Sequence, residues 1–291
     1  MKPIGIATDS HSGITPKDAA ELGVRVMPMP FYCSGECYYE EVSITREEFF
    51  HKLNSGETVT TSQQSPEAVM EFWRDCLKDY EQIVYLPMSS GLSGSCNTAM
   101  MLAMEEEFEN RVFVVDNGRV STPLRRSILD ALELVEEGYP AEKIKEILEA
   151  AKSEMVIYIA VETLEFLKKG GRITPATAAI GTLLNIKPVL KLDVGVLETF
   201  KKCRGMKRAR KDMLEAMQKA FETRFHEEME QNELYLLAAS SADAQTTKEW
   251  IEEIQAFFPG MEVMCADLSL GICCHTGPGA LGIGCSCRPK R

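Results

Sequence analysis

Short apolar runs separated by helix-like stretches mark the first half of the chain. Residues 4–7, 83–86 and 112–115 are apolar without interruption, which is typical of strands buried on both faces. Residues 65–80 place apolar side chains three and four positions apart behind a Ser-Pro cap, which predicts an amphipathic helix. Strands buried on both faces and separated by helices predict a parallel α/β sheet.

Local capping and turn signals predict the smaller elements of this half. Thr15-Pro16 and the capping box from Thr45 to Glu48 indicate the starts of two helices, and the second is expected to end at residues 54–56. The mixture of aromatic residues, Gly and Cys at residues 31–39 predicts a small hairpin. A further helix is expected to open at residues 138–140. The first half is therefore predicted to form an α/β domain.

The pattern changes near residue 153. An antiparallel hairpin is predicted at residues 189–200, turning at Asp193 to Gly195. The elements expected after it are a helix over residues 207–225, a strand over 234–239, a helix over 250–258, and strands around Val263 and Ala280. We therefore predict two domains, an N-terminal α/β domain over residues 1–153 and a C-terminal α+β domain over residues 154–291.

Composition and charge narrow the class of protein. The 291 residues are 45% hydrophobic and 26% charged, which is enough apolar sequence for two packed domains. The 32 basic and 44 acidic residues give a net charge of −12, which argues against sequence-independent nucleic-acid binding. The longest apolar run, Met155 to Val161, is far shorter than the ~20 residues of a membrane-spanning helix, and no signal peptide is evident. We therefore expect a soluble, cytoplasmic protein that binds no nucleic acid and keeps its ten cysteines as thiols.

Three loops rich in hydroxyl groups flank the predicted elements of the first domain, at residues 8–10, 60–65 and 89–95. Parallel strands deliver such loops to one edge of the sheet, where ligands bind. Converging hydroxyls and backbone N–H groups at helix starts bind an anion without a formal positive charge. Each loop taken singly is explained as well by ordinary helix capping. Together the three loops point to an anion site.

Two glycine motifs suggest chemistry that the surrounding sequence does not complete. Gly91 to Ser95 nearly matches the G-x-S-x-G elbow of serine hydrolases, with His275 as the candidate base, but no spacing nominates the acid of a triad. Gly277 to Gly282 fits the dinucleotide fingerprint G-x-G-x-x-G, but the nine residues that follow cannot supply its helix and second strand. Close backbone packing, against a ligand or across the domain boundary, is the better interpretation of that motif.

Cysteine and basic residues leave further alternatives open. No two cysteines have the C-x-x-C spacing of a zinc knuckle, so thiols are favoured over a metal site. Seven basic residues lie from Lys201 to Lys211, either as the solvated start of a helix or as a docking face for an acidic partner or an anionic lipid headgroup. Arg172 follows the double glycine at residues 170–171, either as a surface residue after a helix cap or as a group that meets an anion.

Taken together, and in this order, the motifs resemble the DegV family of fatty-acid-binding subunits that work with a fatty acid kinase. The similarity spans nearly the whole chain. The matching motifs are Asp9-Ser10, residues 61–63 with Ser65-Pro66, residues 89–94, 164–173 and 184–188, Arg204-Gly205, His275 and residues 277–282. Two segments depart from the usual family pattern: Gln64 stands where the family usually has Pro, and residues 117–123 are poorer in Ser and Ala.

The resemblance implies a Rossmann-like N-terminal α/β domain, a C-terminal α+β domain and a long-chain fatty acid in an apolar tunnel between them. It implies that Thr61 and Ser93 hydrogen-bond the carboxylate, and that Arg172 and His275 lie near the headgroup or the kinase-facing rim. The resulting ligand-binding set is Thr61, Ser62, Ser93, Gly94, Arg172 and His275, without a catalytic residue, a cofactor or a metal. We further expect the last strand to place His275 near the Ser93 loop, because the glycines around it allow close approach.

The expected function is therefore that of a non-enzymatic, cytoplasmic carrier. It would bind a long-chain fatty acid such as palmitate, present it to a fatty acid kinase for acyl-phosphate formation, and make transient contact with a membrane surface. Burying each methylene group contributes ~0.8 kcal/mol, so the tail would set affinity and the hydroxyls would set orientation. The alternative is an acyl ester or thioester hydrolase that uses Ser93 with His275.

Overall fold

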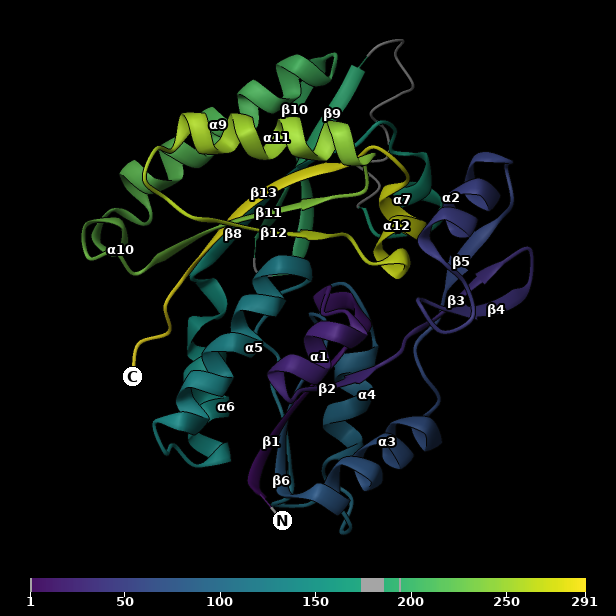
Figure 1. The fold of residues 1–291 in the computed structure, drawn as a ribbon, viewed down its shortest axis with the longest axis vertical. Helices are drawn as coiled ribbons and strands as arrows, with labels where there is room; N and C mark the ends of the chain where they lie inside the picture. Colours follow the sequence, from purple (N-terminus) through teal and green to yellow (C-terminus); the bar gives the residue numbers. More distant parts are fainter. Residues whose placement is uncertain (1, 174–185, 194) are drawn as a thin grey trace. The chain divides into compact units, whose positions relative to one another are not determined.

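The computed structural model describes residues 2–173, 186–193 and 195–291, which fall into two units (Figure 1). The first unit contains the described residues up to Ser153 together with Pro289–Arg291, and the second contains those of Glu154–Arg288. The last three residues group with the first unit, although the sequence suggested the second. Arg291 accounts for this grouping, because it forms ion pairs with Glu133 and Glu137 at 3.6 and 2.6 Å.

A parallel four-stranded sheet lies at the centre of the first unit, as the apolar runs predict. Its strands are β1 (Lys2–Asp9), β2 (Arg25–Met27), β6 (Tyr80–Leu86) and β7 (Val112–Val114). The order is β2–β1–β6–β7, and every neighbouring pair is parallel. Ile6 and Val84 join one apolar cluster while Ala7 and Tyr85 join another, because successive side chains of a strand point to opposite faces.

Helices cover both faces of this sheet. They are α1 (Pro16–Leu22), α3 (Pro66–Asp79), α4 (Ser95–Leu102), α5 (Ser121–Glu136) and α6 (Ala141–Ala150), with the short 3-10 turns η1 (Ser10–Ser12) and η2 (Ala151–Ser153). Trp73 of α3 and Phe108 are buried in one of the two apolar clusters of this sheet, and Ile128 of α5 and Ile144 of α6 are buried in the other. Figure 1 shows α3 and α4 on one side and α5 and α6 on the other. This is the α/β layer arrangement that the sequence predicts.

The helix α5 is an element of this unit that the sequence pattern hides. Its first residue, Ser121, has a left-handed backbone with φ 56°, and Pro123 follows within the same turn. Its buried residues include Arg126 and Asp130, whose side chains are joined by a hydrogen bond of 2.9 Å. Because two charged residues pair within the buried face, they interrupt the apolar periodicity by which a helix is recognised.

A three-stranded antiparallel sheet and α2 complete the first unit. The sheet contains β3 (Pro30–Cys33), β4 (Glu36–Tyr39) and β5 (Val59–Thr61), in the order β4–β3–β5. The helix α2 (Arg46–Asn54) begins with the predicted capping box, in which Thr45 Oγ1 accepts from the Glu48 N–H at 3.2 Å and the Glu48 carboxylate accepts from the Thr45 N–H at 2.8 Å. The hairpin and the capped helix are both confirmed.

In the described part of the second unit, six strands form a mixed sheet. They are β8 (Met155–Ala160), β9 (Ile186–Asp193), β10 (Val196–Arg204), β11 (Leu234–Ser240), β12 (Val263–Asp267) and β13 (Leu281–Cys287). The order is β10–β9–β8–β13–β11–β12, in which β11 and β12 are parallel and the other neighbours antiparallel. The predicted hairpin is β9–β10, where Val196 pairs with Asp193.

Helices cover this second sheet as well. They are α7 (Glu165–Lys169), α9 (Met206–Thr223), α10 (His226–Glu230), α11 (Ala244–Phe257) and α12 (Leu270–Thr276). Figure 1 shows α9 and α11 side by side over one face, where Met213, Met217 and Trp250 are buried in the same apolar cluster as Ile283 of β13. The predicted α+β organisation of the second half is confirmed.

Candidate functional site

The carboxyl ends of β1 and β6 are tied together by side chains. Thr8 donates from Oγ1 to the carbonyl oxygen of Leu86 at 2.7 Å. The buried Asp9 carboxylate accepts from the backbone N–H groups of His11 and Met88, at 2.9 and 2.8 Å. The Nδ1 atom of His11 lies 3.1 Å from the same carboxylate. These contacts fasten the first hydroxyl-rich loop to the segment that leads into the third.

The third loop, residues 89–95, is held from the other side by the end of β7. The Asp116 carboxylate accepts from the Ser90 backbone N–H at 3.2 Å and from the Ser90 hydroxyl at 2.6 Å. Lys152 Nζ lies 2.7 Å from this carboxylate. Burial favours a raised pKa for Asp116, but hydrogen bonds from Lys152 and Ser90 outweigh burial and hold the pKa below its usual value. The carboxylate therefore stays ionised and anchors the loop.

Ser93 and Gly94 lead into the first turn of α4. The Ser93 hydroxyl oxygen accepts from the Ser95 backbone N–H at 3.2 Å and lies 2.9 Å from the Ser95 hydroxyl. Gly94 is the N-cap residue of α4 and supplies no side-chain cap. A hydroxyl has one donor and two acceptor positions, so Ser93 can accept from Ser95 and still donate to an anion at the start of the helix.

Thr61 is the last residue of β5, and the second hydroxyl-rich loop continues from it. The side chain of Ser62 is exposed, and its hydroxyl donates to the carbonyl oxygen of Gln63 at 3.0 Å. Gln64 donates from Nε2 to the carbonyl oxygen of Pro28 at 2.6 Å. The turn beside Thr61 is therefore closed by side-chain hydrogen bonds.

The Gln63 side chain connects this loop to α4. Its Oε1 atom accepts from the Thr98 hydroxyl on α4 at 3.3 Å. The same atom lies 3.4 Å from the position that a Cβ atom would take on Gly94. The structure thus brings the loop that begins at Thr61 and Ser62 against the start of α4, where Ser93 and Gly94 lie.

The two predicted residues of the second unit, Arg172 and His275, meet at Gly170. Arg172 Nη1 donates to the carbonyl oxygen of Gly170 at 2.6 Å. A Cβ atom on Gly170 would stand 2.0 Å from Nδ1 of His275, so the imidazole occupies space that only a glycine leaves. The predicted set therefore divides into two groups, Arg172 with His275 in the second unit and the other four residues in the first.

One prediction about His275 is wrong. It lies on α12, whereas the last strand, β13, starts only at Leu281. The helix ends at Gly277, whose φ of 72° is a left-handed conformation that glycine adopts without strain. Gly277, one of the glycines that were expected to allow close approach, therefore terminates the helix that carries His275.

The G-x-G-x-x-G motif produces close packing inside the second unit. A Cβ atom on Gly277 would stand 2.5 Å from the ring of Phe166, and one on Gly279 would stand 2.9 Å from the side chain of Glu162. Both neighbours belong to the segment around α7. The finding supports the packing interpretation and brings the motif at residues 164–173 next to the one at residues 275–282.

Part of the basic run from Lys201 to Lys211 is paired within the fold. Lys201 and Arg208 contact the buried Asp212 at 2.9 and 3.0 Å, and the Cys203 thiol donates to the same carboxylate at 3.1 Å. Burial and the Asp212 carboxylate raise the pKa of Cys203 to about 12, so this thiol stays protonated. The further pairs are Arg210 with Glu253 and Lys211 with Glu215. The contacts at Asp212 fasten β10 to α9.

The ten cysteines are free thiols, and most are buried. Burial raises the pKa of Cys76 and Cys265 to about 11 and that of Cys96 to about 12, which makes these thiols poor nucleophiles at neutral pH. Among the described residues, no group of three or more His, Cys, Asp or Glu side chains is arranged to hold a metal ion. No helix in the same part of the chain has both the length and the apolar character needed to cross a bilayer.

Sequence reasoning missed three residues that organise the loops of the first unit. Asp116 carried a signal, because it directly follows a buried apolar run and polar residues at that position face the ligand edge of a parallel sheet. His11 carried a weaker sequence signal, because Asp9 caps the short turn that contains His11. The role of Gln63 depends on a contact with Thr98, 35 residues away, and no local pattern reveals it.

A parallel α/β unit and a mixed α+β unit together define a two-domain α/β class of protein. Residues 3–287 match the model of the family described as "uncharacterised protein, DegV family". The chain therefore belongs to the DegV family, as the motifs predict.

Known proteins similar to this one span nearly its full length. A DegV domain-containing protein of Deinococcus radiodurans is 30% identical over 283 residues, which is 96% of this chain and 97% of the relative. A structure described as fatty acid binding of a DegV family protein from Thermus thermophilus is 35% identical, with a TM-score of 0.87 and coverage of 98% of this chain and 99% of that one. DegV of Bacillus subtilis, described as a fatty acid binding protein, is 27% identical, with a TM-score of 0.78 and coverage of 99% and 100%.

Proposed function

We propose that this protein binds a long-chain fatty acid. The observation that carries the proposal is its 35% identity, over 98% of the chain, to the Thermus thermophilus DegV protein that is described as binding a fatty acid. The Bacillus subtilis protein, described as a fatty acid binding protein, adds support at 27% identity. Because both similarities extend over both units, the ligand class is inferred from the whole fold and not from one motif.

In this proposal the hydroxyls of Thr61 and Ser93 hold the carboxylate, with Ser62 and Gly94 beside them. The Gln63 contact to α4 supports the pairing of the two loops, and the Ser93 hydroxyl keeps a donor position for the ligand. The positive end of the α4 dipole favours an anion at the same place. Each hydrogen bond to an ionised group contributes about 1.5–3 kcal/mol. Neutral donors also leave the carboxylate accessible to a second reactant.

The acyl tail supplies most of the affinity in this proposal. A tail of about 16 carbons gains roughly 12 kcal/mol from burial, before the cost of association is subtracted. The headgroup contacts are smaller than this, so they fix the orientation of the acid. The tail is expected in the apolar tunnel that the family resemblance implies.

We further propose that the protein is a cytoplasmic carrier that presents its ligand to a separate fatty acid kinase. Arg172 and His275 then lie near the headgroup or the rim that faces the kinase. The exposed side chains of Lys202, Arg204 and Lys207 favour transient contact with anionic lipid headgroups. The alternative, an acyl ester or thioester hydrolase that uses Ser93 with His275, is separated from the carrier by the experiment below.

Native mass spectrometry of the purified protein tests the proposal. The expected result is a bound mass equal to that of a long-chain acid such as palmitic or stearic acid, which is released on denaturation. The hydrolase alternative predicts turnover of an acyl ester that Ser93→Ala abolishes. A protein that carries no acid and takes up no added palmitate would contradict the carrier.

A further inference from the structure

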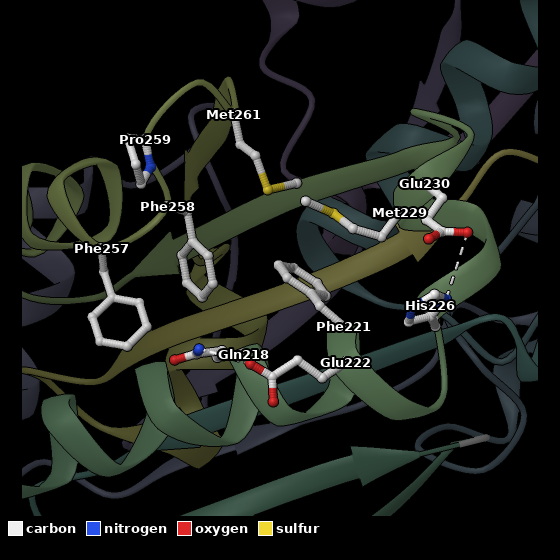
Figure 2. A pocket seen from close by; sticks show the side chains of 10 residues that line it. All are labelled: Gln218, Phe221, Glu222, His226, Met229, Glu230, Phe257, Phe258, Pro259 and Met261. Carbon is white, nitrogen blue, oxygen red and sulfur yellow. Dashed lines mark hydrogen bonds and ion pairs between the residues drawn. The ribbon is translucent and has the colours of Figure 1, made fainter.

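A pocket of about 430 Å³ lies in the second unit, and none of the residues that line it belongs to the predicted ligand site (Figure 2). It is formed by the last turn of α9, by α10 and by the segment that links α11 to β12. Pockets of this size accept a small ligand or an anchoring side chain. The proposed function leaves this pocket unexplained.

Aromatic rings form the floor of the pocket. Phe221 and Phe257 both pack against Phe258, with ring centroids 5.2 and 5.0 Å apart. Phe221 and Phe258 are buried, but Phe257 at one end of the pocket is 38% exposed and Met229 at the other end is 37% exposed (Figure 2). Large apolar side chains that stay exposed together at a concave site mark an interaction surface.

The rim of the pocket is acidic. Glu222 and Glu230 stand at its edge in Figure 2, where His226 Nδ1 lies 3.7 Å from Glu230 and Gln218 donates to Glu222 at 2.8 Å. Arg224, which lies between them in sequence, is paired with Asp193 at 2.8 Å.

Helix geometry adds negative charge to the same place. The last turns of α9 and α11 contribute to the lining, and neither helix has a basic residue in its last turn. The carboxyl end of a helix carries a partial negative charge of about one half. The pocket therefore has an apolar floor, with two carboxylates and the carboxyl ends of helices around it. Such a surface complements an apolar group flanked by cations.

We propose that this pocket docks a basic segment of a protein partner, in which one aromatic or long aliphatic side chain is flanked by Lys or Arg. The anchor lies on the phenylalanine rings and the cations face Glu222 and Glu230. The acidic rim disfavours a fatty carboxylate or an anionic lipid, so the pocket differs in specificity from the proposed headgroup site.

Methyl NMR of the full chain labelled at its methionines tests the proposal. The probe is the capped hexapeptide Lys-Arg-Trp-Leu-Lys-Arg. It is expected to shift the methyl signals of Met229 and Met261, which line the pocket, and to leave those of the exposed Met101 and Met104 unchanged. Raising the salt concentration should weaken the binding, because rim charges are screened. Peptides with Glu in place of the basic residues, or Ala in place of Trp and Leu, are expected to bind at least tenfold more weakly.

Two sets of variants separate the rim from the rest of the surface. Glu222→Gln combined with Glu230→Gln should weaken the peptide about threefold or more, as expected for two exposed charges. Glu249→Gln is the matched control, because Glu249 accepts from Gln245 on α11 at 2.9 Å just as Glu222 accepts from Gln218, and it does not line the pocket. It should leave the affinity unchanged.

Three results of the peptide experiments would overturn the proposal. They are no shift at Met229 and Met261, equal binding of the acidic peptide, and equal weakening by the control variant. Shifts of these two methyl signals with protein concentration alone would assign the pocket to self-association and overturn it as well. Palmitate binding is measured in parallel, and its loss or retention bears on the fatty-acid proposal alone.

Discussion

At the scale of single residues, the Thr61 and Ser93 hydroxyls can be removed with little change in shape. Thr61→Val and Ser93→Ala should each weaken palmitate binding by about 1–3 kcal/mol, because each removes a hydrogen bond to an ionised group. Isothermal titration calorimetry measures the loss, and thermal unfolding checks that the fold persists. Thr60→Val is the control, since Thr60 is the exposed neighbour on the same strand and should bind palmitate as the parent does. Unchanged affinity in both test variants would place the carboxylate elsewhere.

Gly170 offers a test of His275 that leaves the imidazole in place. Its backbone is helical, with φ −78°, so alanine fits the conformation, but the new Cβ atom would stand 2.0 Å from Nδ1 of His275. Gly170→Ala should therefore displace the ring and reproduce the effect of His275→Ala. For both variants we expect kinase-dependent phosphorylation of the acid to fall while palmitate binding is retained.

The comparison of the two variants decides what the histidine does. Phosphorylation assays and palmitate titrations on both proteins give the readout. If neither variant alters phosphorylation, His275 has only a structural role in the packing of α12 on α7. If Gly170→Ala alone impairs it, the glycine acts through another neighbour.

Individual residues were predictable where the chemistry is local. Spacing alone predicted the capping pair of Thr45 and Glu48, which the structure confirms, whereas Thr61 and Ser93 come from motifs that resemble a family and stay predictions. Gln63 reaches a helix 35 residues away, and Gly170 matters because of a histidine that the chain delivers about a hundred residues later. Such contacts between distant segments have no pattern along the chain.

At the scale of elements, the Asp116 carboxylate links the end of β7 to the Ser90 loop. Asp116→Asn removes the charge that Lys152 and Ser90 contact, so it should destabilise the protein by about 1–3 kcal/mol at pH 7 and loosen the loop that carries Ser93. Denaturant unfolding measures the free energy of unfolding, and palmitate titration reports the state of the loop.

The difference in unfolding free energy between the parent and Asp116→Asn should depend on pH, and the pKa of Asp116 fixes the sign of that dependence. The pKa of Asp116 is lowered in the folded protein, so its stabilising contribution is fully present above the usual value of about 4 and is lost as the pH falls through the lower folded value. The difference in unfolding free energy between the parent and Asp116→Asn should therefore be constant from pH 5 to 7 and shrink below about pH 4. A difference that grows on acidification would contradict this assignment.

Helices and strands were predictable where their buried positions are all apolar and regularly spaced. The strands β6 and β7 are buried on both faces and read as unbroken apolar runs, and α3 keeps a regular apolar stripe. The helix α5 buries Arg126 and Asp130 as a pair and starts from a left-handed Ser121, so both its periodicity and its N-terminal signal are concealed. The helix α12 was not predicted, because its seven residues are too few to show a regular apolar stripe.

At the scale of the whole molecule, the acidic chain contains the basic run from Lys201 to Lys211, and the side chains of this run have different roles. Lys201 is tied to the buried Asp212 at 2.9 Å, whereas Lys202 and Lys207 are exposed and form no ion pair with the described residues. A docking surface for an acidic partner or an anionic membrane would therefore use Lys202 and Lys207. The run as a whole cannot be treated as one patch.

Charge reversal at single lysines separates these roles. Lys201→Glu should lower the free energy of unfolding by about 1–3 kcal/mol, because it sets a second carboxylate against Asp212, whereas Lys202→Glu combined with Lys207→Glu should change it by less than about 1 kcal/mol. The double variant should instead bind vesicles that contain phosphatidylglycerol about tenfold or more weakly, because each lysine near an anionic surface contributes about 1 kcal/mol. Vesicle sedimentation at low and high salt measures this loss, and palmitate binding should be retained. If the double variant sediments with vesicles as the parent does at low salt, the exposed lysines are only solvated and the membrane contact must be abandoned.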